Sequence, residues 1–469
     1  MAPEHTHQTF TTYGWAVCVW VLVVSFQYGY HISALNQIQA VLTCQNVNDT
    51  SPLYHGLPVC VPMSDTTFSV VTSIFTIGGL VGSLSANIAT NRLGRKGACQ
   101  VSALSTSFGA ALSGVAASVS SLAFGRFFVG LGAGLGLCIG PIYLAEIAPS
   151  KIKGNLGKRN YANARVLTQL AIVVGIMVTQ SVGVAWATPR QWRLVLLLSS
   201  AISLTQLVTS PFIIESPVYL LQTGKLDRQK VAMNKIWSGK TPLRPDPEES
   251  ASEEPLLGDE DRSQPREDVF SVSRLLFSHE YRKPMLIIIS AMLCQQLSGI
   301  NAVLYYSNSI LAKALPDLAA FVSLGITVVN FLMTFPPIFL INRFGRKKLM
   351  QLSIFCAIVS HVLVGYGLDG ARNTLASVAI ITFVMSFAVG LGPIPFVMIP
   401  EVSPSHVSSA ISSVALSLNW VSNFIIGLVF LPLRNSLSSG DPLKEGRVFY
   451  IFAAVLCVCA IVFSRLYRG

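Results

Sequence analysis

The sequence RLGRK at residues 92–96 returns as RFGRK at residues 343–347, and EIAP at residues 146–149 returns as EVSP at residues 401–404. The second copies follow the first by 251 and 255 residues, in the same order. Two motifs that recur together at nearly one offset indicate a duplicated unit. The chain is therefore expected to consist of two related halves.

Long apolar runs surround these motifs. Hydrophobic residues make up 52% of the 469 residues, charged residues only 12%, and the mean hydropathy is +0.57. A bilayer core needs about 20 consecutive apolar residues for each helix. Twelve such runs occur, at 15–35, 66–89, 98–117, 122–144, 167–187, 192–214, 284–305, 318–341, 349–368, 375–399, 408–431 and 448–466. The sequence thus predicts an all-α membrane protein with twelve transmembrane helices in two pseudo-symmetric six-helix halves.

A polar stretch separates the sixth run from the seventh. We expect an N-terminal six-helix half at 1–221, a cytoplasmic linker at 222–283 and a C-terminal six-helix half at 284–469. The middle of the linker is rich in Pro and acidic residues, a composition that cannot form a core and predicts disorder. Its flanks, Lys225 to Trp237 and Val269 to Tyr281, alternate basic and apolar residues and predict short helices on the membrane surface.

The net charge of +11 follows the loops. With the N-terminus placed in the cytoplasm, 25 of the 33 Lys and Arg residues fall in inner segments and seven in outer segments. This excess agrees with the positive-inside rule, so the basic charge indicates a membrane topology and not a nucleic-acid partner. An even number of helices places both termini in the cytoplasm.

The loop after the first run is expected to lie on the outer side. It holds Cys44, Cys60 and the only N-x-[ST] sequon, at Asn48. On that side of a membrane these residues predict a disulfide bond and a glycan, and two unpaired thiols are the alternative. The other seven Cys lie in or beside apolar runs, where they are expected to pack as small apolar residues.

Each RxGRK turn places a Gly between basic residues. Gly permits a tight bend between helices, and guanidinium groups pair well with carboxylates at the ends of other helices. We expect a cytoplasmic latch whose ion pairs exist only while the inner side is closed, which favours an outward-open state. A simple positive-inside anchor is the alternative. The latch residues are Arg92, Arg95, Glu146, Glu215, Arg343, Arg346 and Glu401.

The seventh run contains QQLSGIN at residues 295–301. Carboxamides at the depth of a bilayer are costly unless they have hydrogen-bond partners. Gln295, Gln296 and Asn301 spread over an arc of the helix that can face one cavity, and Gly299 weakens the helix beside them. Amides both donate and accept, as vicinal hydroxyl groups do, so the run favours a neutral polar solute. Hydrogen bonding between helices is the alternative interpretation.

More amides occur at similar depth in other runs. The fifth run holds Gln169, the eighth Asn330, and the eleventh Asn419 and Asn423. The last two flank Trp420, whose aromatic face suits the C–H face of a pyranose while its indole N–H can donate. Together these side chains predict a binding site for a small sugar between the helices.

The chain resembles the sugar porter family of the major facilitator superfamily. The likeness rests on the motifs above, on GPIP at residues 392–395 and on NWVSNF at residues 419–424. That family contains facilitative hexose carriers and sugar–proton symporters, and the likeness follows nearly the whole chain. It implies that sugar hydroxyls bind to Gln169, Gln295, Gln296, Asn301, Asn330 and Asn423. It also implies that Tyr305 and Tyr306 form the outer gate.

Proton coupling depends on two positions. Symporters of the family pair an aspartate in the first helix with an arginine in the fourth, and the corresponding residues here are His31 and Arg126. Burial and a neighbouring guanidinium both disfavour a charged imidazole, which favours uniport. A symporter in which the proton binds His31 is the alternative. The sequence also departs from the family at Ala388 and Phe396, where a glutamate and a tryptophan are usual, so the particular sugar stays open.

Other functions fit the sequence less well. It has no cluster with metal-ligand spacing, no phosphate-binding glycine loop and no nucleophile–base pair, so we expect no enzyme, no catalytic residues and no metal or cofactor site. A non-transporting sugar sensor on the same fold would need a long cytoplasmic tail, and the chain continues for only a few residues after the twelfth run.

The linker carries SEEPLL at residues 252–257, which resembles an acidic dileucine sorting sequence. A sorting adaptor is therefore a candidate partner beside the sugar and the bilayer. The candidate locations are the plasma membrane and a vacuolar or lysosomal membrane.

Overall fold

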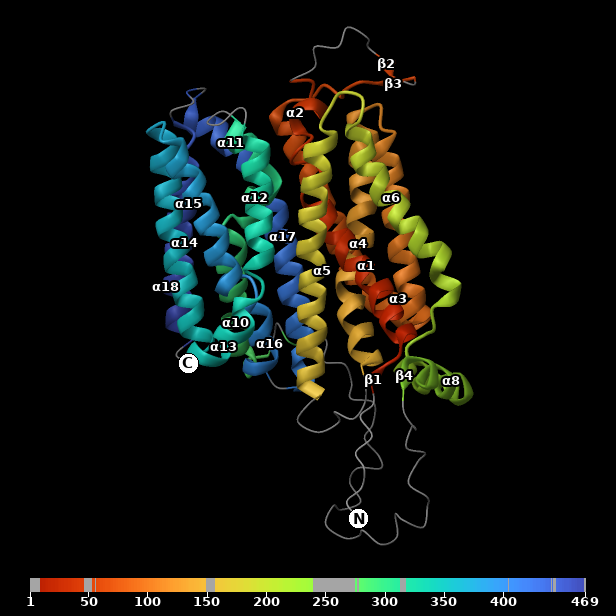
Figure 1. Ribbon diagram of the computed structural model, residues 1–469. Helices are drawn as coiled ribbons and strands as arrows, with labels where there is room; N and C mark the ends of the chain where they lie inside the picture. The colour runs from red at the N-terminus through yellow and green to blue at the C-terminus, as the bar shows by residue number, and fades with distance from the viewer. Residues whose placement is uncertain are drawn as a thin grey trace.

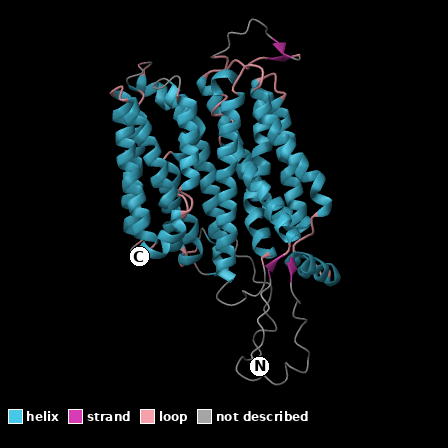
Figure 2. Cartoon of the chain, viewed as in Figure 1, coloured by secondary structure: helices cyan, strands magenta, loops and turns pink. Residues whose placement is uncertain are grey.

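Helices make up nearly all of this computed structural model, which describes residues 9–45, 53–54, 56–148, 157–238, 275, 278–312, 318–403, 405–439, 441 and 444–467. The helices run side by side across one bundle (Figure 1), and the few strands lie at its two ends (Figure 2). The first described strand and the end of the last helix lie at the same end of the bundle.

The elements of the first half are β1 (Thr9–Phe10), α1 (Thr12–Ile32), α2 (Gln39–Leu42), β2 (Leu53–Tyr54), β3 (Leu57–Pro58), α3 (Asp65–Gly114), α4 (Val119–Ile147), α5 (Gly157–Trp186), α6 (Trp192–Thr209) and the 3-10 helix η1 (Ser210–Phe212). The elements that follow it are α7 (Pro217–Gln222), α8 (Leu226–Ile236) and β4 (Trp237–Ser238). α8 occupies the first flank of the linker, where the sequence predicted a short helix.

The elements of the second half are α10 (Arg282–Leu297), α11 (Ile300–Ala312), α12 (Ala319–Leu332), α13 (Pro336–Phe344), α14 (Arg346–Asp369), α15 (Asn373–Ser386), the π-helix η4 (Phe387–Leu391), α16 (Ile394–Val402), α17 (Ser405–Ser438) and α18 (Arg447–Leu466).

The described helices account for twelve membrane spans. Ten helical stretches are long and apolar enough to cross a bilayer. One of them, α3, has 50 residues, which at 1.5 Å per residue is about 75 Å, more than twice the thickness of a bilayer core. Gly94, with φ of 78°, divides α3 into two spans. The shorter apolar helix α12, continued by α13, supplies the remaining span and confirms the predicted fold class.

Three predicted helices are interrupted. The seventh span breaks between α10 and α11 at Gly299, whose φ is 78°, a conformation that costs Gly little. The eighth span turns before Pro336, and the tenth changes into the π-helix η4 before Pro393. The apolar runs did not specify these interruptions, which occur where Gly adopts a positive φ or where Pro has no N–H for a helical hydrogen bond.

Two helices begin earlier than predicted. α5 starts at Gly157 and not at residue 167, and α17 runs over Ser405–Ser438 and not over 408–431. The polar residues 158–165, which have no apolar pattern, therefore belong to α5. Hydropathy finds the part of a helix that lies in lipid, and these helices continue beyond it.

Close helix packing needs glycine at particular positions. A Cβ atom on Gly130 of α4 would lie 1.9 Å from the carbonyl oxygen of Phe75 in α3, and one on Gly29 of α1 would lie 1.9 Å from that of Ile172 in α5. These helices pack backbone against backbone, as small residues allow in membranes.

The two ends of the bundle have different local structure. At the end that we call the disulfide end, Cys44 and Cys60 are joined, with their Cα atoms 5.3 Å apart. At the other end, which we call the linker end, β1 pairs antiparallel with β4, and Trp237 Nε1 donates to the Ile147 carbonyl oxygen at 3.0 Å. The predicted glycan at Asn48, the sorting sequence at 252–257 and most of the second linker flank lie outside the described residues.

Candidate functional site

The site begins with a carbonyl group in the tenth span. Pro395 has no N–H to give to the carbonyl oxygen four residues before it, that of Leu391. Gln295 supplies the missing donor from α10: its Nε2 lies 3.0 Å from the Leu391 oxygen and 2.6 Å from the Gly392 oxygen. The first glutamine of QQLSGIN therefore joins the seventh span to the tenth at the point where both are irregular.

A chain of carboxamides continues from Gln295. Gln296 Nε2 donates to Gln295 Oε1 at 2.9 Å, and Asn301 Nδ2 donates to Gln296 Oε1 at 2.8 Å. All three side chains are buried. The second bond crosses the helix break, so it links α10 to α11. Each carboxamide has two N–H groups, and these bonds use only one from Gln296 and one from Asn301.

A second amide pair lies on α17. Asn423 Nδ2 donates to Asn419 Oδ1 at 3.1 Å. The Asn423 Oδ1 atom is buried and has no partner among the described residues. A buried acceptor without a partner costs about 1–3 kcal/mol, which a hydroxyl donor from a solute would recover.

Trp420 does not offer a free aromatic face in this conformation. Its side chain is 1% exposed and packs edge-on against Tyr28 and Phe75 of the first half, with ring centroids 5.7 and 6.2 Å away. A Cβ on Gly79 would lie 2.3 Å from the indole, so only Gly leaves room for it. In this conformation the indole joins the two halves, and its face is not available to stack on a sugar ring.

The structure does not bring every predicted amide together. Gln169, on α5, is exposed, and Asn330, on α12, is partly exposed. No hydrogen bond among the described residues joins either side chain to the amide chain of Gln295, Gln296 and Asn301. Their role at the sugar stays a prediction.

His31 and Arg126 are adjacent, but their side chains do not pair. Arg126 Nη1 donates to the His31 carbonyl oxygen at 3.1 Å, and the guanidinium lies over the ring of Phe75, 4.7 Å from its centroid. The imidazole faces α6, where its Nε2 lies 2.5 Å from Ser199 Oγ. That hydroxyl already donates to Gln27 Oε1 at 2.8 Å, so the imidazole is the donor and carries its proton on Nε2.

Tyr305 and Tyr306, the predicted gate residues, are buried in α11. The Tyr306 hydroxyl donates to the Gly427 carbonyl oxygen of α17 at 2.8 Å, and its ring stacks on Phe430 at 5.5 Å. Phe68 of the first half contacts the same ring edge-on at 6.2 Å. Tyr305 packs at right angles to Tyr306, 6.0 Å away. The rings fill the space between α3, α11 and α17.

The predicted latch residues pair within each half. Arg95 Nη2 lies 2.7 Å from Glu146 Oε1, and Arg346 Nη2 lies 2.6 Å from Glu401 Oε1. Arg92 and Arg343 are exposed. Each of these two ion pairs joins helices of one half, so neither holds the halves together in this conformation. A role that differs between states stays a prediction.

Glu215 binds the first RxGRK turn from the segment before α7. Its Oε1 accepts from the backbone N–H groups of Arg95 and Lys96 at 2.9 and 3.0 Å. A Cβ on Gly94 would lie 2.3 Å from Glu215 Oε2, so the turn needs Gly for space as well as for its positive φ. Burial raises the pKa of the Glu215 carboxyl, and the hydrogen bonds from Ser216, Lys96 and Arg95 oppose that shift.

The sequence pattern described as "Sugar (and other) transporter" matches residues 17–467. The chain belongs to this sugar transporter family. It is 32% identical over 472 residues to a probable metabolite transport protein of Saccharomyces cerevisiae, covering 94% of this chain and 90% of that one. It is 34% identical over 449 residues to the human facilitated glucose transporter member 4 of solute carrier family 2, covering 92% and 83%.

The fold of the transporter is that of the major facilitator superfamily. The xylose transporter XylE from E. coli, in a partially occluded inward open conformation, matches with a TM-score of 0.71 and 18% identity over 98% of this chain and 100% of that one. The chain is thus an integral multi-pass membrane transporter for sugar, and not an enzyme.

Sequence reasoning missed the hydrogen bonds that join the two halves of the transporter at the disulfide end. Asn36, just after α1, donates to Ser307 Oγ at 2.7 Å and accepts from the Asn308 backbone N–H at 3.1 Å. Its neighbours Ser33 and Gln37 donate to carbonyl oxygens of Leu304 and Ala320. The polar run that ends the first apolar stretch, NQIQ at residues 36–39, is the pattern that would have revealed them.

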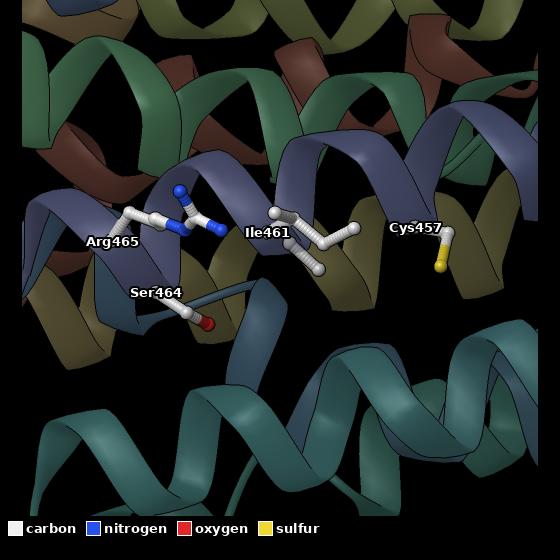
Figure 3. Close-up of a pocket in the computed structure, with 5 residues that line it drawn as sticks. Cys457, Ile461, Ser464 and Arg465 are labelled. Atoms are coloured by element: carbon white, nitrogen blue, oxygen red, sulfur yellow. The ribbon is translucent and has the colours of Figure 1, made fainter.

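A surface pocket of the transporter lies away from this site. Figure 3 shows that Cys457, Ile461, Ser464 and Arg465 line it. They lie on one side of α18, and none belongs to the amide chain. We assign no solute to this pocket.

Proposed function

We propose that the protein carries a hexose-type sugar across the membrane by facilitative uniport, with alternating access between its two halves. The observation that carries this proposal is the buried amide chain of Gln295, Gln296 and Asn301. It supplies N–H donors and carbonyl acceptors in one buried row without a net charge. Sugar hydroxyls both donate and accept, so such a row matches a neutral polyol better than it matches an ion.

Uniport follows from the surroundings of His31 and Arg126. Among the described residues, no carboxylate contacts either side chain, and the imidazole donates from Nε2 to Ser199. A proton-coupled carrier needs a group whose charge changes during the cycle. A neutral imidazole buried beside a guanidinium resists protonation, because burial and like charge both disfavour the charged form.

Alternating access is supported by the placement of the contacts between halves. The hydrogen bonds of Ser33, Asn36 and Gln37 to α11 and α12 lie at the disulfide end. The ion pairs at the linker end stay within one half. We assign the disulfide end to the outer side and the linker end to the cytoplasm, so this conformation is closed to the outside.

The test is uptake of radiolabelled hexoses by the purified protein in proteoliposomes, with and without an inward-acid pH gradient. The proposal expects uptake that stops at equal concentrations inside and outside, with or without the gradient. Accumulation above equilibrium that requires the gradient would reject uniport. Binding of hexose with no uptake under any condition would favour a sugar sensor.

The second candidate is proton-coupled symport through His31. The Nδ1 atom of its imidazole is buried and without a partner among the described residues, as are Nε and Nη2 of Arg126. Of these atoms, the His31 Nδ1 has a lone pair to which a proton can bind, whereas the guanidinium nitrogens only donate. Gradient-driven accumulation that is lost in His31→Asn, with equilibrium exchange of sugar retained, would establish this alternative.

The compartment, the glycan and the sorting adaptor remain parts of the proposal. The Cys44–Cys60 bond favours an oxidising compartment on the outer side. A mobility change on deglycosylation, absent in Asn48→Gln, would establish the glycan. Microscopy of the full chain and of Leu256→Ala/Leu257→Ala would distinguish a plasma membrane from a vacuolar or lysosomal one, and would test whether the linker binds a sorting adaptor.

A further inference from the structure

His361 is a buried histidine of α14 that the amide chain does not include. Its side chain is 1% exposed and lies among aromatic rings. The ring centroids of Phe383, Phe449 and Phe452 are 4.4, 5.9 and 6.2 Å away. A polar ring in such surroundings costs free energy unless it makes a hydrogen bond.

The hydrogen bond of His361 ends on the break in the seventh span. Its Nε2 atom lies 2.8 Å from the carbonyl oxygen of Ser298. Because a carbonyl oxygen only accepts, Nε2 carries the proton and donates it. The Nδ1 atom has no partner among the described residues, so the bond to Ser298 is the polar contact that fixes the ring.

The break leaves backbone carbonyls at the end of α10 without helical partners. Ser298 Oγ donates to the Gln295 carbonyl oxygen at 2.6 Å, and the Gly299 N–H donates to that of Gln296 at 3.2 Å. These donors come from the break itself. The Ser298 carbonyl differs, because its donor comes from another helix.

The aromatic rings around His361 also fit the break. A Cβ atom on Gly299 would lie 3.1 Å from Phe452, the ring that contacts the imidazole. α14 and α18 therefore hold the residues of the break from one side, through one hydrogen bond and one ring.

The break sets the geometry of the amide chain. Gln295 and Gln296 precede it and Asn301 follows it, and the Asn301–Gln296 bond of 2.8 Å spans it. The gate residues Tyr305 and Tyr306 lie further along α11. A small change of angle at Ser298 and Gly299 moves the amides on the two sides of the break relative to each other.

We propose that His361 is a positioning residue for sugar binding, which holds the Ser298 carbonyl and thereby fixes the angle between α10 and α11. The proposal rests on the proposed sugar transport. His361 does not touch the sugar, and its effect passes through the alignment of Gln296 with Asn301.

The first test compares hexose uptake by His361→Phe and His361→Gln in proteoliposomes. Phe keeps an aromatic ring in the site and removes the donor, whereas Gln keeps an N–H that can reach a carbonyl. We expect His361→Phe to raise KM about tenfold, the factor that about 1.4 kcal/mol represents, with kcat changed by less than about threefold. His361→Gln should restore most of the affinity.

Phe463→Leu is the matched control, since Phe463 is a fully buried ring of α18 that contacts Tyr467. A role in stability alone predicts less folded protein in His361→Phe with an unchanged KM, and that result would overturn the proposal. If His361→Phe does not fold, the smaller His361→Asn removes the same bond without enlarging the side chain.

A second measurement does not depend on the solute. Hydrogen–deuterium exchange of the backbone amides at residues 300–303 measures how often the backbone hydrogen bonds next to the break open. We expect it to be at least about tenfold faster in His361→Phe than in the wild type and in Phe463→Leu. If the wild type carries no hexose, sugar transport fails as the function while this measurement still decides the positioning role. Equal exchange rates in all three proteins would refute that role.

Discussion

At the scale of single residues, the Gln295 side chain uses most of its hydrogen bonds to stabilise the fold. Its N–H groups satisfy the carbonyls of Leu391 and Gly392, and its carbonyl oxygen accepts from Gln296. Little hydrogen-bonding capacity remains for a solute. Gln296 and Asn301 keep unused N–H groups, so they are better placed to bind hydroxyls.

Gln295→Ala should lower both stability and uptake, whereas Gln296→Ala should lower uptake with a smaller loss of stability. The first change leaves the Leu391 carbonyl without a donor, which costs about 1–3 kcal/mol. Thermal unfolding in detergent and uptake in proteoliposomes measure the two effects. Equal losses of stability in the two variants would show that the Leu391 bond is not what distinguishes Gln295.

At the scale of elements, the irregular tenth span depends on its neighbour α14. Ser353 Oγ donates to the Ser386 carbonyl oxygen at 2.5 Å and accepts from the Leu391 N–H at 3.0 Å. One hydroxyl thus satisfies backbone groups at both ends of η4. In lipid, backbone groups without partners are costly, so the π-helix needs this support.

Ser353→Ala should destabilise the protein by about 2 kcal/mol, because it removes partners from two buried backbone groups. Ser377→Ala is the matched control, since the buried Ser377 hydroxyl of α15 has no partner among the described residues. Unfolding midpoints in denaturant measure both. A Ser377→Ala variant as unstable as Ser353→Ala would mean that the loss of volume, and not of hydrogen bonds, causes the effect.

The pH dependence of the turn at the linker end follows from Glu215. Because the folded pKa of this carboxyl is raised by burial, the folded state binds its proton more readily than the unfolded state does. Stability therefore increases as the pH falls through the raised pKa and levels off below about 4.5, the ordinary value. We expect the melting temperature of the wild type to rise relative to Glu215→Gln between pH 7 and pH 5. A constant difference between the two proteins over this range would contradict the shift.

The sequence predicted the elements better than their joints. The twelve spans follow from local composition, and the structure confirms this fold class. The capture of the Leu391 carbonyl by Gln295, the burial of Trp420 against Gly79 and the bonds of Asn36 were not predicted. Each of these contacts joins residues that are far apart in the sequence. A local sequence pattern does not show which distant residues come into contact.

At the scale of the whole molecule, the halves meet at the disulfide end through neutral hydrogen bonds and through Asp65, which accepts from Asn435 at 3.0 Å and lies 3.9 Å from Arg434 Nη2. Asn36 is the centre of the neutral bonds, with bonds to Ser307, to Ser323 and to the backbone of Asn308. Neutral bonds of this kind contribute about 1 kcal/mol each, and a few of them suffice to shift a two-state equilibrium without fixing it.

Asn36→Ala should shift the transporter towards an outward-open state. A cysteine introduced at Ser309 of α11, in a protein whose seven free cysteines are replaced by serine, reports this through labelling by an impermeant maleimide from outside. We expect labelling several-fold faster in Asn36→Ala than in the parent protein. Gln39→Ala, which removes a nearby buried amide whose Oε1 has no partner among the described residues, should label at the parent rate, and equal rates in all three proteins would contradict the closing role of Asn36.

The pairing of β1 with β4 has a consequence for how the protein is made. Thr9 and Phe10 pair with Ser238 and Trp237, so the start of the first span has no strand partner until translation has passed the whole first half. At about 5–20 residues per second, Phe10 leaves the ribosome roughly 10 to 45 seconds before Trp237. During that interval the first span is held in the membrane by its apolar residues and by the spans that come to pack on it, and its N-terminal strand pairs only after all six spans of the first half have been synthesised.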